Sequence, residues 1–220
     1  MLTQLDGKEG SMARPRRFTP PHSVLHLVNR GNDRKQLFGG AREYEDFLNL
    51  VAAVKVRCPM RLLAYCLMPN HWHMVVWPEP GQSVAAFCHR LCTIHAIRHR
   101  RETGTVGFGH LYQHRYHSFA IESERQYYAV MRYVEANAAR SGLVALAEHW
   151  RWSNLAERCG PDRGLLAPGP LDLPKGWAAL VNESLPPDVL AETRARLHRT
   201  RPYDLRLLTP RYARTASKSG

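Results

Sequence analysis

The sequence predicts an α+β fold of the ferredoxin-like, split-βαβ type, an antiparallel sheet with its helices packed on one face. Two observations carry this prediction. Short β-rich runs alternate with longer segments of helical periodicity, and two of the strands follow one another directly through a turn. The resulting order, β-α-β-β-α-β-α, contains two βαβ-like halves, which build such a sheet. We expect an irregular and partly helical extension after it.

The expected strands are bounded by turn-forming residues. The first ends at an Asn-Arg-Gly-Asn sequence, and the second and third are joined as a hairpin through Met68-Pro69-Asn70. The strands are expected at residues 24–28, 62–68, 71–77 and 116–121.

Three helices are expected between and after these strands. Apolar residues keep helical spacing along the first helix, and Cys58-Pro59 ends it. Ser83 and Ser123 are suitable N-caps for the other two helices, and Gly142 is suited to terminate the last one. The helices are expected at residues 41–56, 83–101 and 123–141.

The chain of 220 residues is long enough for one domain with an appended tail. We divide it into a disordered leader (1–13), a main domain (14–153) and a basic, partly disordered C-terminal extension (154–220). No apolar run is long enough to span a bilayer, and five cysteines at irregular spacing indicate free thiols in a reducing compartment. We therefore expect a cytoplasmic protein without a membrane partner.

The charge balance favours nucleic acid as the partner. Thirty-one Lys and Arg residues against nineteen Asp and Glu residues give a net charge of +12. Such a surface attracts polyanions, and arginine, which outnumbers lysine, makes forked contacts to phosphate. A merely soluble basic protein is the alternative that charge alone leaves open.

His71 and His73 lie two residues apart in an expected strand, so both imidazoles share one face while Trp72 points to the other. Two neutral imidazoles on one side of a sheet can chelate a divalent cation. A His-x-His pair in a strand is more often two polar side chains on a solvent face. The apolar run at 74–77 predicts that the strand is buried on both faces, which argues against a solvent face. An unliganded pair of imidazoles would be costly to bury there.

Tyr133, Asn137 and Arg140 occupy positions i, i+4 and i+7 of the last expected helix and therefore share a face. A phenol, a carboxamide and a guanidinium in one row are unusual for a helix that only packs. A half-buried tyrosine with its hydroxyl in water is an equally good interpretation of the residues alone. Tyr127 and Tyr128 are better explained by packing or base stacking.

Four segments, in this order, resemble the Y1 transposases, the IS200-like class of HUH nucleases, and more narrowly the REP-associated tyrosine transposases. The segment with the His-Trp-His sequence resembles the family's His-hydrophobe-His motif, and the last one resembles the helix with the nucleophilic tyrosine. The resemblance covers roughly residues 14–153. The segments are VNRGN (28–32), LAYCLMPNHWH (63–73), GHLYQHRY (109–116) and RYVEAN (132–137).

The resemblance implies a metal-dependent endonuclease and strand transferase for single-stranded, hairpin-forming (REP-like) DNA. Tyr133 would attack a phosphodiester and form a 5′-phosphotyrosine, whose covalent link conserves the energy of the broken bond for rejoining. Mg²⁺ or Mn²⁺ would be held by His71 and His73, with Asn137 as the third protein ligand or its water anchor.

DNA contacts are expected on the basic surface. The candidate regions are an N-terminal arm, the His- and Arg-rich span 89–117 and the basic tail 191–220. A solvated helix face is the alternative for the second region. The candidate DNA-binding residues are Arg14, Arg16, Arg17, Arg30, Arg90, Arg98, Arg115 and Arg140.

Two other functions compete with the nuclease. A catalytically silent DNA-hairpin-binding regulator would keep the same fold, although the presence of all four implied site residues favours the enzyme. RNA binding on a ferredoxin-like sheet would call for an aromatic RNP signature, which the sequence lacks. We expect a nucleoid-associated protein that acts as a monomer, with a dimer as the alternative.

Overall fold

A computed structural model describes residues 23–107 and 109–198, which include the whole predicted sheet. Several predictions concern residues outside these ranges. They are the leader (1–13), Arg14, Arg16, Arg17 and the end of the extension (199–220).

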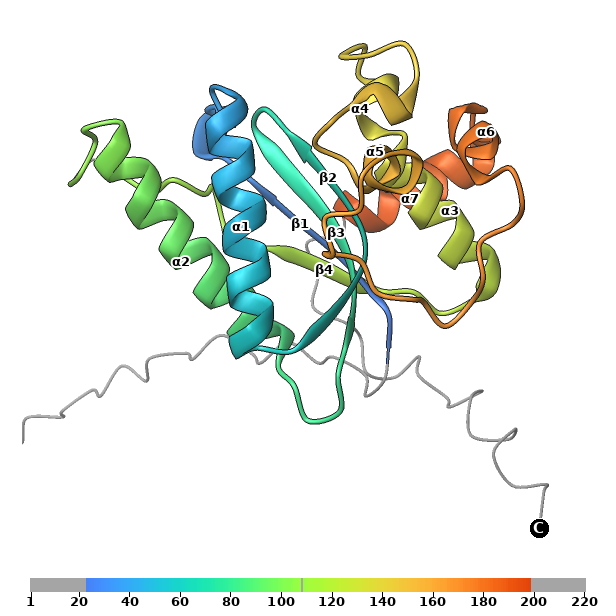
Figure 1. Cartoon of the computed structure of the whole chain (residues 1–220), viewed down its shortest axis with the longest axis horizontal. Coiled ribbons are helices and arrows are strands. Elements are labelled where there is room, and N and C mark those ends of the chain that lie inside the picture. Colours follow the sequence, from blue (N-terminus) through green and yellow to red (C-terminus); the bar gives the residue numbers. More distant parts are fainter. Residues whose placement is uncertain (1–22, 108, 199–220) are drawn as a thin grey trace, which may run out of the picture. The chain divides into compact units, whose positions relative to one another are not determined.

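Four antiparallel strands form the sheet, in the order β2-β3-β1-β4 (Figure 1). β1 (Leu25–Arg30) pairs with β3 (His71–Pro78) on one side and with β4 (His117–Ala120) on the other. β2 (Met60–Met68) is an edge strand and forms the predicted hairpin with β3. Two βαβ-like halves therefore interleave in one sheet, which confirms the predicted α+β fold class.

The first strand is longer than predicted. Asn29 and Arg30 were assigned to a turn, but both belong to β1, where they pair with Trp72 and His71 of β3. Polar residues at a strand end look like a turn in the sequence, and only pairing with a neighbouring strand shows otherwise. The other strand limits differ from the prediction by one or two residues, as strand ends commonly do.

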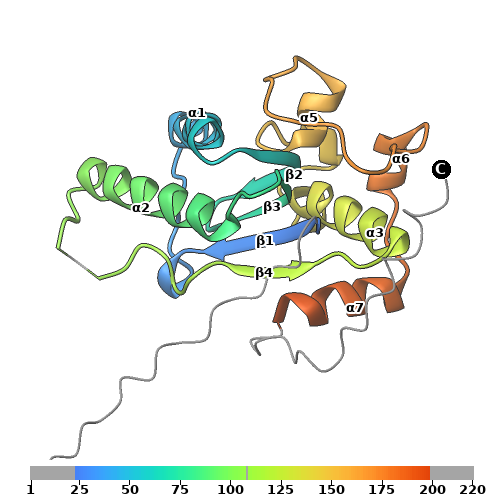
Figure 2. The ribbon, with the colours of Figure 1, turned by 90° about the horizontal axis from the view of Figure 1, so that it is seen from below.

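α1 (Ala41–Arg57) and α2 (Val84–Glu102) lie next to each other over one face of the sheet (Figures 1 and 2). The ring of Phe47 on α1 lies 6.3 Å from the ring of Trp72 on β3, measured between centroids. The Ser83 hydroxyl accepts a hydrogen bond from the backbone N–H of Ala86, so the predicted N-cap of α2 is confirmed.

The opposite face of the sheet is covered by α3 (Glu124–Glu135). Tyr133 of α3 lies against His73, and His73 points away from its neighbour Trp72, which contacts α1. The prediction that all helices share one face is therefore corrected: it holds for α1 and α2 and is wrong for α3. The physical reason is the nearly continuous apolar sequence of β2, which makes both faces of the sheet hydrophobic, so that both need a cover.

The predicted helix 123–141 is divided at Ala136 into α3 and α4 (Asn137–Arg140). Its predicted ends are confirmed. The Ser123 hydroxyl accepts from the N–H of Gln126, and Gly142 adopts a positive φ of 74°. The N–H of Gly142 donates to the Ala139 carbonyl in a Schellman-type terminus, a conformation that favours glycine.

The extension contributes three more helices, α5 (Asn154–Cys159), α6 (Trp177–Asn182) and α7 (Pro187–His198). Two short 3₁₀ helices, η1 (Asn32–Arg34) and η2 (Ala147–His149), connect other elements. The domain limits at 14, 153 and 220 stay a prediction. No helix in the described part of the chain is both long and apolar enough to cross a bilayer.

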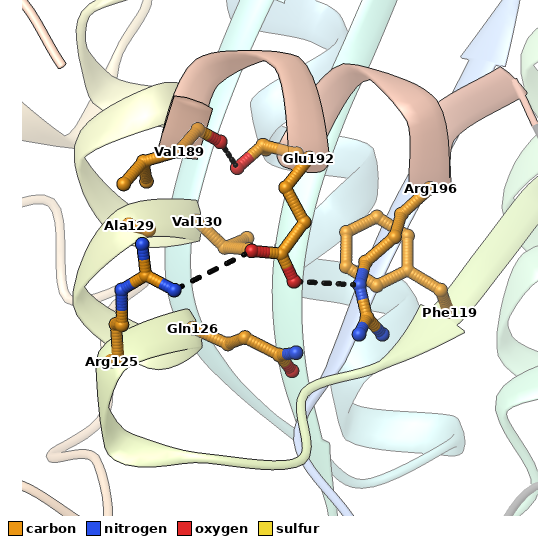
Figure 3. Close-up of a pocket in the computed structure, with 9 residues that line it drawn as sticks. Phe119, Arg125, Gln126, Ala129, Val130, Val189, Glu192 and Arg196 are labelled. Atoms are coloured by element: carbon orange, nitrogen blue, oxygen red, sulfur yellow. Dashed lines mark hydrogen bonds and ion pairs between the residues drawn. The ribbon is translucent and has the colours of Figure 1, made fainter. Parts of the chain in front are cut away.

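α7 packs against α3 through ion pairs around a small pocket (Figure 3). Glu192 of α7 lies 3.6 Å from Arg125 of α3 and 3.5 Å from Arg196 of its own helix, measured between the charged atoms. Phe119 and Val130 contribute apolar lining from the sheet and from α3. The pocket contains none of the predicted site residues, so we assign it to the packing of the extension.

His95 on α2 predicts that acid destabilises the protein. Its side chain is buried against Phe47 and its Nδ1 lies 2.6 Å from the Tyr112 hydroxyl. Burial, and to a smaller extent the nearby His99 and Arg98, lower the pKa of His95 to about 3. Below pH 6.5 the unfolded chain binds a proton that the folded chain does not, so this contribution to stability is complete above pH 6.5 and is lost towards pH 3.

We expect the free energy of unfolding to fall by about 1.4 kcal/mol per pH unit in this window from His95 alone. Urea denaturation at pH 7.5, 6.5 and 5.5 measures it. The His95→Gln variant should show a shallower dependence on pH, whereas His89→Gln, at an exposed position of the same helix, should keep the wild-type slope. Equal slopes in all three proteins would contradict the assignment.

Candidate active site

The paired histidines and the tyrosine meet on the face of the sheet that α3 covers. Ring centroids of His71 and His73 lie 5.0 Å apart, and those of His73 and Tyr133 lie 6.0 Å apart. Trp72 is buried on the other face, where its Nε1–H donates to the Tyr112 hydroxyl at 3.2 Å. Strand alternation therefore places the side chains as the sequence predicts.

One nitrogen of each histidine is already engaged. Nδ1 of His71 lies 2.7 Å from Oδ1 of Asn70, an acceptor, so His71 carries its proton on Nδ1. Nδ1 of His73 lies 2.9 Å from Nε2 of His26. The Nε2 atoms of His71 and His73 are thus the nitrogens left for a ligand.

Both imidazoles are uncharged near neutral pH. Burial, and to a smaller extent the positive charges of Arg30 and Arg140, lower the pKa of His71 to about 4. The pKa of His73 is lowered well below its ordinary value, mainly by burial and then by the neighbouring histidines and arginines. Neutral imidazole is the form that binds a metal ion.

Arg140 contacts both Tyr133 on α3 and Asn137 on α4. Its guanidinium lies 3.9 Å from the centroid of the Tyr133 ring, and its Nη1 donates to the Tyr133 carbonyl at 3.1 Å. Its Nη2 donates to Oδ1 of Asn137 at 2.9 Å. The predicted shared face of these three residues is thus present, although the helix is interrupted between them.

Asn137 is buried beside this group and is only partly satisfied. Its Oδ1 accepts from Arg140, and its Nδ2 has no hydrogen-bond partner among the described residues. A buried amide with an unused donor is costly in a closed core. Its position one turn beyond Tyr133 places it at the same site.

The candidate DNA-binding arginines are divided between several places. Arg30 is exposed at the end of β1 and pairs with His71 in the strand register, so it lies beside the histidines together with Arg140. Arg90 and Arg98 are exposed on α2, which covers the opposite face, and Arg115 is exposed before β4. The structure therefore brings Arg30 and Arg140 to the site and leaves Arg90 and Arg98 away from it.

The turn after Arg30 holds the ends of two strands together. The N–H of Gly31 donates to the Asn70 carbonyl at 2.9 Å, next to His71. A Cβ at Gly31 would lie 2.2 Å from the Lys35 carbonyl oxygen, so the close approach of the backbone requires glycine. The N–H of Gln113 donates to the Arg30 carbonyl at 2.9 Å, so the segments 28–32 and 109–116 lie side by side.

Two neighbours of the candidate site residues were missed in the sequence. His26 contacts His73, and Glu135 lies fully buried two residues after Tyr133. A histidine within the apolar strand 24–28 and a carboxylate in the tyrosine helix were visible signals. The residues that they contact could not be identified from the sequence, because those residues come from other elements of the fold.

Comparison with known proteins identifies the family. The model of the IS200-like transposases matches residues 21–137, more than half of the chain. A solved structure described as a REP-associated tyrosine transposase bound to a REP hairpin has the same fold. It is 20% identical, with a TM-score of 0.56 over 71% of this chain and 89% of that chain.

A Deinococcus radiodurans structure described as a transposase matches at 18% identity, with a TM-score of 0.40 over 56% of this chain and 96% of that chain. No curated protein gives a significant match. The agreement of the family match with the sheet, the histidine pair and the tyrosine helix leads to one conclusion: this chain belongs to the IS200-like transposase family.

Proposed function

We propose that this protein cuts and rejoins single-stranded DNA through a covalent bond to Tyr133. The observation that carries the proposal is the meeting of Tyr133, His73 and Arg140, which come from three different elements, on one face of the sheet. Packing alone gives no reason to gather a phenol, two imidazoles and a guanidinium at one place.

In the proposed reaction the Tyr133 oxygen forms a bond to phosphorus and gives up its proton to solvent. The bond between phosphorus and the 3′ oxygen breaks, and that oxygen takes a proton to become a free hydroxyl. Rejoining is the reverse, with a 3′-hydroxyl as nucleophile and Tyr133 as leaving group. Arg140 over the tyrosine ring would stabilise the negative charge that develops at the phenol oxygen and the phosphate.

We further propose that His71 and His73 bind Mg²⁺ or Mn²⁺ through Nε2, with Asn137 as a third ligand or water anchor. The residues fit such an ion in two respects: both imidazoles are neutral, and both Nδ1 atoms are engaged, which leaves the Nε2 atoms for the ion. Asn137 would act through Oδ1, which keeps a second lone pair beside the bond from Arg140, while its Nδ2, unpartnered among the described residues, could donate to a phosphate oxygen. Among the described residues no cluster of three His, Cys, Asp or Glu side chains forms a metal site, so water and phosphate oxygens would complete the coordination. A bound ion would polarise the phosphate.

The proposed substrate is single-stranded DNA that forms a hairpin of the REP type. The net charge of +12 suits a polyanion, and the structure with a TM-score of 0.56 is described as bound to a REP hairpin. Tyr133 lies over the sheet of its own chain, which supports a monomer as the acting form. We expect it to act on DNA in the cytoplasm, at the nucleoid.

The proposal is tested with hairpin DNA labelled at its 3′ end, because the 5′-phosphotyrosine would remain on that fragment. With Mg²⁺ or Mn²⁺ we expect a labelled band that migrates with the protein on a denaturing gel, and we expect EDTA to abolish it. Hairpins that bind the protein but give no adduct across a panel of sequences would refute the nuclease. They would leave a DNA-binding regulator on the same fold.

A further inference from the structure

We propose that His26 is a positioning residue, which accepts the Nδ1 proton of His73 and thereby turns the Nε2 lone pair of His73 towards the candidate site. The inference rests on the proposed function only for the reason why His73 is oriented, which is to bind a metal ion. The tautomer of His73 is itself a property of the metal-free protein.

His26 is held in one orientation. Its side chain is completely buried on β1, and its Nε2 lies 2.9 Å from Nδ1 of His73. The two imidazole rings are nearly parallel, with an interplanar angle of 7° and centroids 5.1 Å apart. Phe119 of β4 packs against His26 edge to face at 5.0 Å. The contact to His73 is therefore set by the sheet and not by a mobile side chain.

Only one proton fits between the two nitrogens, which allows two arrangements. If His73 donates, its Nε2 has a free lone pair, and His26 carries its own proton on Nδ1. If His26 donates, the proton of His73 sits on Nε2, and that nitrogen cannot bind a metal ion. Nδ1 of His26 is buried without a hydrogen-bond partner among the described residues in either case.

The charges around the site favour the first arrangement. Arg140 lies over the ring of Tyr133, which packs against His73, and Arg30 pairs with His71 in the strand register, so both positive charges lie beside the histidines. Positive charges in the neighbourhood stabilise a lone pair on Nε2 of His73 and destabilise an N–H in the same place. The same arrangement leaves His71, which donates Nδ1–H to Asn70, and His73 with matching Nε2 lone pairs.

A hydrogen bond of this kind commonly fixes the orientation of a metal-binding histidine and contributes to affinity. His26→Phe keeps a ring against Phe119 but removes the acceptor. His26→Gln is the conservative partner, because its Oε1 can occupy the place of Nε2 and accept from His73. These two variants separate the loss of the acceptor from the loss of buried volume.

The first measurement is ¹⁵N NMR of the histidine side chains in the metal-free protein. We expect His73 of the wild type and of His26→Gln to carry its proton on Nδ1, and His26→Phe to lose this preference. The second is a Mn²⁺ titration followed by EPR of the free ion. We expect His26→Phe to bind Mn²⁺ about 10- to 100-fold more weakly, and His26→Gln to stay close to wild type.

A wild-type His73 protonated on Nε2 would overturn the proposal, and so would a His26→Phe variant with an unchanged tautomer. The wild-type spectrum decides the question even if His26→Phe does not fold. If the wild type neither binds Mn²⁺ nor forms a DNA adduct while His73 carries its proton on Nδ1, the proposed function fails and the assignment of His26 stands.

Discussion

Replacing Tyr133 with phenylalanine is expected to abolish the covalent DNA adduct completely, while the fold and the binding of hairpin DNA persist. The variant lacks a single oxygen atom, and its ring can keep the contacts to His73 and Arg140. Within the described part of the chain no hydrogen bond involves the Tyr133 hydroxyl, so we expect unfolding free energy to change by no more than about 0.5 kcal/mol. A denaturing gel, fluorescence anisotropy with labelled hairpin and urea denaturation measure the three quantities.

Tyr128→Phe is the matched control on the same helix. The Tyr128 hydroxyl donates to the Asp172 carbonyl at 2.9 Å, away from the histidines, so this variant should form the adduct at the wild-type rate. An adduct that survives Tyr133→Phe would mean that another residue is the nucleophile. Loss of hairpin binding in Tyr133→Phe would assign the hydroxyl to DNA recognition instead.

Glu135→Ala is expected to be the most destabilising single substitution that we predict, with a loss of about 3–5 kcal/mol. Glu135 is fully buried on α3, and its carboxylate accepts hydrogen bonds from Asn154 of α5 and Trp177 of α6. It also pairs with Nε of Arg158 at 3.3 Å. Removing the carboxylate leaves these donors and a partly buried guanidinium without their acceptor. Urea denaturation at pH 7.5 measures the effect.

Glu135→Gln separates the charge from the volume. It keeps the size of the side chain and one acceptor oxygen, so we expect an intermediate loss of about 1–3 kcal/mol. Glu124→Ala, at an exposed position in the first turn of the same helix, should cost at most about 1 kcal/mol, through the helix dipole. A Glu135→Ala variant no less stable than Glu124→Ala would show that the buried network contributes little.

The buried Glu135 carboxylate also helps to position the helix that carries Tyr133. Glu135 follows Tyr133 by two residues and connects the tyrosine helix to α5 and α6 of the extension. α7 adds the ion pair of Arg125 with Glu192 at the other end of that helix. The extension thus holds the helix that carries the proposed nucleophile against the sheet.

Much of this structure was predictable from neighbouring residues. The hairpin at Met68-Pro69-Asn70, the caps at Ser83 and Ser123, and the termination at Gly142 depend on contacts within about five residues, which the sequence displays directly. The shared face of His71 and His73 follows from strand alternation in the same way.

The remaining features depended on which distant segments meet. The cover of α3 on the second face of the sheet follows from two-sided burial of β2 and β3, which the prediction of a one-sided layer overlooked. The interruption at Ala136 leaves the row from Tyr133 to Arg140 intact because the guanidinium reaches back to it. Neither outcome is set by the helix sequence alone.

The positions of the candidate site residues therefore follow from local sequence, whereas the residues that surround them do not. The sequence by itself determined the order of the elements, the histidine pair on one face and the row that begins at Tyr133. Only the tertiary structure decided that His26 meets His73 across 47 positions of the chain, and that Trp177 meets Glu135 across 42. The physical reason is that local contacts are encoded by spacing along the chain. Contacts between distant residues depend instead on strand register and on how whole elements pack.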